Sequence, residues 1–124
     1  MDMFKVTTEI RAIILSSKEI TAIIGNKVFP IIAPEGTNGD FIIYQRDGYK
    51  QNDTKFGVAL QIPIVNICVI SEDYDRSQDL ASLIYDSLSR KFNNPNMVIK
   101  LEDSTEDYVD KKFIQVLQFS ISSI

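Results

Sequence analysis

The chain has 124 residues, with no histidine, no tryptophan, a single cysteine and a formal net charge of −4. This length suits one domain with its own hydrophobic core, and we take residues 1–124 as that domain. Without histidine, the Ser-His-Asp and Cys-His catalytic arrangements and the usual zinc sites are excluded. No apolar run approaches the roughly 20 residues that span a bilayer, and the N-terminal segment lacks the features of a signal peptide. We therefore expect a cytoplasmic protein without a membrane partner.

Two helical segments are expected in the first 25 residues. Apolar residues recur at helical spacing over residues 3–15. The segment 16–19, Ser-Ser-Lys-Glu, resembles a capping box that opens a short second helix. Gly25 follows at the position where a left-handed cap ends a helix most easily.

The middle of the chain is expected to be extended. The predicted segments are a short strand at 27–32, a Pro/Gly loop at 33–40, a strand at 41–47, a polar hairpin tip at 48–55 and a long strand at 56–71. The strand at 41–47 is rich in the aromatic and β-branched residues that favour strands. Pro63 cannot donate a ladder hydrogen bond, so we expect a bulge or bend beside it.

A second main helix and two further strands complete the expected fold. Ser71 to Asp73 precede a helix whose buried stripe is Leu80, Ala81, Ile84 and Leu88. A turn at 93–96, a strand at 97–102, an acidic loop at 103–107 and a strand at 113–122 follow. Short connections favour antiparallel pairing. We therefore predict an α+β two-layer sandwich, with a mostly antiparallel sheet of four to five strands and two main helices on one face.

Few residues offer chemistry. Glu72, Asp73 and Asp75 are candidates for a metal site or an acid–base pair, but carboxylates in a first helical turn also serve as caps. Cys68 lies in an apolar strand and is expected to be a buried, inert thiol. The loop Gly36-Thr37-Asn38-Gly39 lacks the Lys-Ser/Thr of a phosphate-binding loop. We predict no catalytic, cofactor-binding or metal site, and hence no enzyme.

The hairpin around residues 44–56 holds the candidate interaction residues. Tyr44, Tyr49 and Phe56 form either an aromatic contact patch or ordinary strand packing. The basic residues Arg46 and Lys50 lie between these aromatic residues. The predicted interface residues are therefore Tyr44, Arg46, Tyr49, Lys50 and Phe56. Basic residues elsewhere are scattered among acidic ones, so no specific nucleic-acid binding is expected.

The order of these elements and several short motifs resemble the tail-completion or tail-terminator proteins of long-tailed bacteriophages and prophages, which are minor tail proteins that join head and tail. The motifs are I-I-G-N-K-V-F-P at 23–30, A-P-E-G at 33–36 and F-I-I-Y-Q-R at 41–46. Segment 61–71 resembles the central strand of that family, and 74–88 the helix after it. Two departures are Asp40 where the family favours proline, and Pro63 within the central strand.

The resemblance implies a structural protein that forms a hexameric ring on the head-proximal end of the tail tube. The ring would end tube polymerisation and form the head–tail joining surface, with the tail-tube protein and a head–tail connector protein as partners. The tip at 47–56 would contact a neighbouring copy, and an acidic lumen would let DNA pass without binding. The location implied is the virion tail, with assembly in the bacterial host cytoplasm.

Two alternatives remain open at this point. One is a neck or head-completion connector protein, which the sequence separates poorly from a terminator. The other is an α+β protein-interaction module unrelated to phage, for which a concave apolar pocket would be expected.

Overall fold

The computed structural model describes residues 2–53 and 59–123, without the side chains of Met3, Ser123 and residues 49–53 and 59–61. The helices are the single-turn 3-10 helix η1 (Met3–Lys5), α1 (Val6–Ser16), α2 (Lys18–Ile24) and α3 (Tyr74–Leu88). The strands are β1 (Val28–Pro30), β2 (Phe41–Asp53), β3 (Ala59–Ser71), β4 (Lys91–Phe92), β5 (Met97–Val109) and β6 (Lys112–Ser123).

The strands form one six-stranded sheet in the order β1-β2-β3-β6-β5-β4. β1 runs parallel to β2, and the other neighbours are antiparallel. The predicted four- to five-stranded, mostly antiparallel sandwich with two main helices was therefore wrong, because the sheet is mixed and three α-helices accompany it. β1 is parallel because the loop at 31–40 returns the chain to the end of the sheet where β1 began. β4 was not predicted, because a strand of two residues is too short to show an alternation of apolar and polar side chains.

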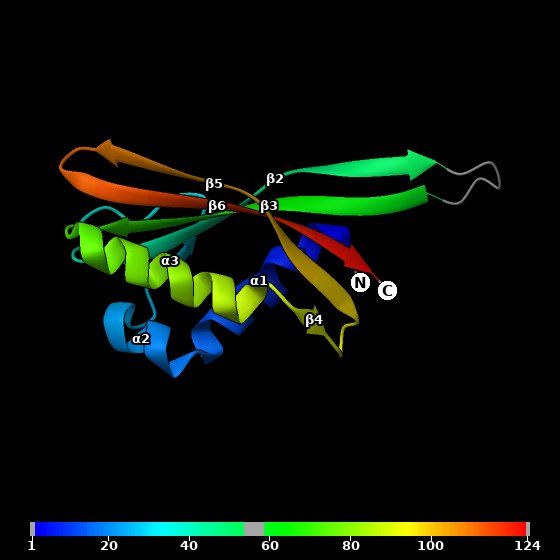
Figure 1. The fold of residues 1–124 in the computed structure, drawn as a ribbon, viewed down its shortest axis with the longest axis horizontal. Helices are drawn as coiled ribbons and strands as arrows, with labels where there is room; N and C mark the ends of the chain where they lie inside the picture. The colour runs from blue at the N-terminus through cyan, green and yellow to red at the C-terminus, as the bar shows by residue number, and fades with distance from the viewer. Residues whose placement is uncertain (1, 54–58, 124) are drawn as a thin grey trace.

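The helices lie on one face of the twisted sheet (Figure 1). Ile10 and Ile14 of α1 and Ile84 of α3 are fully buried in the same core as Ile67 of β3 and Phe119 of β6. Burying one such side chain contributes roughly 1.5–3 kcal/mol. This single core holds the sheet and the three α-helices together.

The helix ends follow the sequence signals. The Ser17 hydroxyl oxygen accepts a hydrogen bond from the N–H of Ile20 at 3.3 Å, which confirms a serine cap before α2. Gly25 ends α2 as expected, but with φ 64° and ψ −131° it is not in the left-handed helical conformation predicted; it adopts another conformation that only glycine reaches at little cost. The Asp73 carboxylate caps α3 by accepting the N–H of Arg76 at 2.9 Å. These local signals explain why the positions of the helices were predictable.

The strands reach further than predicted. β2 continues through residues 48–53, which were expected to be a polar tip, and β5 continues through 103–107, expected to be an acidic loop. Residues 103–107 form a strand despite their acidic side chains, because pairing with β6 supplies hydrogen bonds to the backbone. The bulge expected beside Pro63 lies on the partner strand instead, at Asp47, where the β2–β3 register shifts between Arg46 and Gly48; Pro63 itself pairs with Tyr49.

One end of the β2–β3 hairpin projects from the sheet. Pairing between β3 and β6 begins at Ile64 and Ser120. Beyond that point residues 49–53 of β2 and 59–63 of β3 pair with each other, and no third strand joins them within the described ranges. We call this two-stranded ribbon the arm. Figure 1 places the arm at one end of the long axis and the β5–β6 turn at the other.

Candidate assembly surfaces

The predicted interface residues lie in different surroundings. Tyr44 is only 8% exposed and belongs to the core. Arg46 is partly buried, and its guanidinium carbon lies 4.7 Å from the centroid of the Phe4 ring. Tyr49 and Lys50 lie in the arm on β2, where their side chains are not described, and Phe56 falls outside the described residues. The role of these five residues in an interface remains a prediction.

A cluster of exposed apolar side chains surrounds Arg46. Phe4, Ile31 and Ile32 are 71%, 66% and 76% exposed. Phe4, Ile31 and Arg46 line one shallow hollow of about 220 Å³ at the edge of the sheet beside β1. We call Phe4, Lys5, Ile31, Ile32 and Arg46 the Arg46 patch. Sequence reasoning missed its apolar members, because an exposed isoleucine cannot be distinguished from a buried one by residue type.

The backbone of the Arg46 patch is strained at Ile31. This β-branched residue has a φ of 66°, a value that is a genuine outlier for such a side chain. Its N–H donates to the carbonyl oxygen of Tyr44 at 2.9 Å, which ties the end of β1 to β2. The Nη1 atom of Arg46 is buried and has no hydrogen-bond acceptor within the described residues. Strain and an unpartnered buried donor both tend to occur at functional surfaces.

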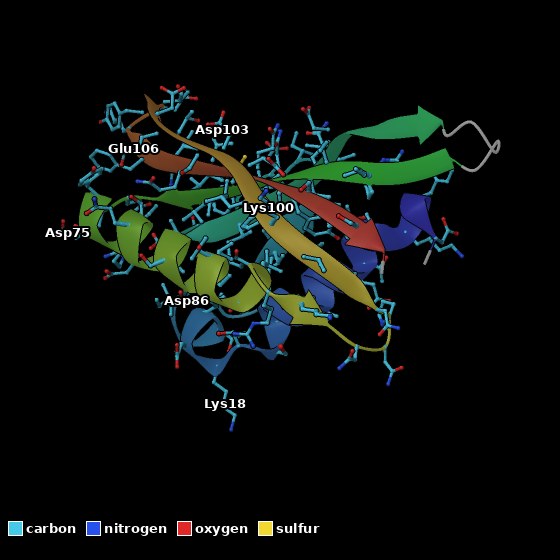
Figure 2. All side chains as sticks on the ribbon, turned by 45° about the vertical axis from the view of Figure 1, so that its right-hand side comes forward. Lys18, Asp75, Asp86, Lys100, Asp103 and Glu106 are labelled. Atoms are coloured by element: carbon cyan, nitrogen blue, oxygen red, sulfur yellow. The ribbon has the colours of Figure 1, made fainter. Side chains whose placement is uncertain are left out.

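A second exposed cluster lies at the β5–β6 turn. Tyr108 and Val109 are 57% and 47% exposed. Asp110 and Lys111, both with positive φ, form the tight turn between the strands. Four exposed carboxylates accompany them, namely Asp103, Glu106, Asp107 and Asp110. We call these residues the β5–β6 tip; Figure 2 shows Asp103 and Glu106 on this part of β5.

Hydrogen bonds and ring stacking fix the conformation of the β5–β6 tip. Glu106 accepts a hydrogen bond from Gln115 Nε2 at 2.7 Å and another from the Tyr74 hydroxyl at 2.8 Å. These bonds lower the pKa of Glu106, and the bond to Glu106 raises the pKa of Tyr74. The Tyr108 ring packs against the Phe113 ring in a tilted arrangement, with ring centroids 4.9 Å apart. The tip is therefore an ordered, negatively charged surface at neutral pH.

A hollow of about 580 Å³ lies at the base of the arm, between the β2–β3 and β5–β6 hairpins. Ile62 and Ile64 form its apolar part. The polar side chains around them are Asp47, Lys100, Glu102, Gln118, Ser120 and Ser122. This lining is mostly polar and differs from the concave apolar pocket expected of a ligand-binding module.

Asp40 joins the start of β2 to the start of α3. Its buried carboxylate accepts hydrogen bonds from Ser71 Oγ at 2.9 Å and from Arg76 Nε at 2.8 Å and Nη2 at 3.2 Å. Burial alone would raise the pKa of Asp40. The hydrogen bonds from Arg76, Ser71 and the Glu72 backbone, with the charge of Arg76, outweigh burial and hold the pKa below its usual value. Asp40 and Arg76 are far apart in sequence, so no local pattern predicted the pair.

The candidate acidic site after β3 has structural roles instead. Asp73 caps α3, and Glu72 forms an ion pair with Lys112 at 3.0 Å. The described part of the chain contains no group of three or more potential metal-ligating side chains. Cys68 is only partly buried, not fully as expected, and burial raises the pKa of its thiol.

No helix within the described residues is long and apolar enough to cross a membrane. No protein-family model matches the sequence, and no curated protein matches it. One chain of a solved structure, the virion of a native gene transfer agent (GTA) particle, is similar in fold. The similarity has a TM-score of 0.74 and 14% sequence identity, and covers 91% of this chain and 90% of that chain. The protein therefore shares the fold of a virion component along nearly its whole length.

Proposed function

We propose that this protein is a virion structural protein that caps the head-proximal end of a tail tube as a ring. The ring ends tube polymerisation and provides the surface to which the head is joined. The observation that carries the proposal is the likeness in fold, over about nine-tenths of both chains, to a chain of a gene transfer agent virion. The order of sequence motifs, which resembles that of tail terminators, supports the same role.

The shape of the molecule supports an assembly role. The arm presents strand edges that pair with no third strand within the described residues. Such edges are templates for pairing with another chain. The proposed partners are other copies of this chain in a hexameric ring, the tail-tube protein and a head–tail connector protein. The proposed final location is the virion tail, and assembly would take place in the bacterial cytoplasm.

The test is a tube-capping assay. Tail-tube protein encoded with this gene is polymerised with and without the protein, and tube lengths and ends are measured by electron microscopy. We expect shorter tubes that carry the protein at one end only. Binding along tube walls, or no effect on length, would contradict capping. Binding to portal or adaptor protein in place of tube protein would instead identify a neck connector.

A further inference from the structure

The exposed large apolar side chains of the described residues fall mainly into two groups. Phe4, Ile31 and Ile32 belong to the Arg46 patch, and Tyr108 and Val109 belong to the β5–β6 tip, with Tyr74 close to it. We propose that the Arg46 patch of one copy binds the β5–β6 tip of the next copy. This inference rests on the proposed ring and names the two surfaces that would join its subunits.

The charges of the two surfaces are complementary. The tip has four carboxylates and one lysine, Lys111, which forms no ion pair with the described residues; the neighbouring Lys112 is paired with Glu72. The patch has Lys5 and Arg46, with Asp2 as the acidic residue beside them. No carboxylate among the described side chains forms an ion pair with Arg46. Arginine, tyrosine and other aromatic residues dominate the binding energy of interfaces, and arginine pairs well with carboxylates.

The two surfaces lie at opposite edges of the sheet. β1, beside the Arg46 patch, is one edge strand. On the other side, β4 pairs only with Met97 and Val98 of β5, so the outer edge of β5 toward the tip has no partner strand within the described residues. Because the surfaces differ, their contact is heterologous and repeats from copy to copy, and it closes into a ring when its rotation divides the circle.

The first experiment blocks one surface at a time. Ile32→Glu places a negative charge on the patch, and Val109→Lys places a positive charge on the tip. We expect each variant alone to associate about tenfold or more weakly than the original chain. A mixture of the two retains one intact patch and one intact tip, so native mass spectrometry should show a one-to-one dimer that grows no further. Ile23→Glu and Tyr85→Lys, at exposed residues elsewhere, should assemble like the original chain.

A second experiment detects the contact even if association is weak. On a Cys68→Ser background, Ile32→Cys and Val109→Cys copies are mixed with a short bismaleimide. We expect this pair to cross-link about tenfold faster than a control pair of Ile23→Cys and Tyr85→Cys. Cross-linking no faster than the control, or faster between two Ile32→Cys copies, would overturn the inference.

The two proposals fail separately. If the specific cross-link forms but the protein does not cap tubes, the interface stands and the tail-capping function fails. A different result would keep the function and refute this interface. In that case the original chain, Ile32→Glu and Val109→Lys would all cap tubes equally well, and the Ile32→Cys and Val109→Cys pair would cross-link no faster than the control pair.

Discussion

Asp40 shows how one buried carboxylate determines the placement of several elements. Its side chain is 4% exposed, while that of its partner Arg76 is 50% exposed. Solvent therefore screens the charge of Arg76. The contribution of the pair to stability comes mainly from the hydrogen bonds that the buried Asp40 carboxylate accepts. Ser71, at the end of β3, completes the junction.

We expect Asp40→Asn to lower the free energy of unfolding at pH 7 by about 1–3 kcal/mol, because Ser71 and Arg76 lose a charged acceptor. The pKa of Asp40 is lowered in the folded state, so its stabilisation is complete above the ordinary aspartate pKa of about 4 and is lost as pH falls through the folded value. The difference between variant and original chain should therefore shrink below about pH 4. Denaturant unfolding across pH measures this.

Asp86→Asn is the matched control for that measurement, since Asp86 lies on the exposed side of the same helix. It should change the free energy of unfolding little at any pH. A difference for Asp40→Asn that stays constant down to low pH would contradict the assigned role of its charge.

At the scale of elements, the arm extends away from the core (Figure 1). The core cluster includes Tyr44 of β2 and Val65 of β3, and the buried Pro63 lies at the base of the arm. Lys50 and Ile62 are paired across the arm, so a two-residue Asn-Gly turn can join them.

We expect replacement of residues 51–61 by Asn-Gly to shift the melting temperature by less than about 5 °C, because every residue of the core cluster and the buried Pro63 are retained. The same variant should lose tube capping if the arm contacts a neighbour or the tube. Thermal unfolding and the tube-length assay measure the two effects. Full capping by the shortened chain would show that the arm is dispensable.

The elements also show what the sequence predicts well. Ser17, Gly25 and Asp73 mark helix ends through contacts within a few residues, so local patterns were sufficient. The parallel pairing of β1 and the length of β5 depend on partner strands far along the chain. The second half of β5 was predicted to be a loop because its residues are mostly acidic. Arg46 was proposed as an interface residue from its place in the hairpin, and that role stays a prediction. Phe4 was not, because it lies beside an apolar helical stripe and its exposure is decided by tertiary packing.

For the whole molecule, the distribution of charge bears on DNA. The net charge is −4, and the β5–β6 tip concentrates four carboxylates. A free subunit with this charge distribution repels the phosphate backbone more than it attracts it, and the net charge of each copy stays negative in the proposed ring.

We expect no gel shift of duplex DNA at physiological salt, with any dissociation constant weaker than the roughly 10⁻⁴ M limit typical of non-specific binding. A variant with Asp103, Asp107 and Asp110 all changed to lysine is the positive control and should bind DNA in a salt-dependent manner. A clear shift with the original chain would contradict the proposed non-binding channel.

The limited contact between the two long hairpins has a mechanical consequence. They share eight residue pairs, from Ile64 with Ser120 to Ser71 with Phe113. The arm begins where this shared pairing ends, so its direction can change without breaking any of the eight pairs. In the proposed ring, such a subunit would keep a rigid body for its neighbours while its arm adjusts to a tube whose subunits are spaced differently.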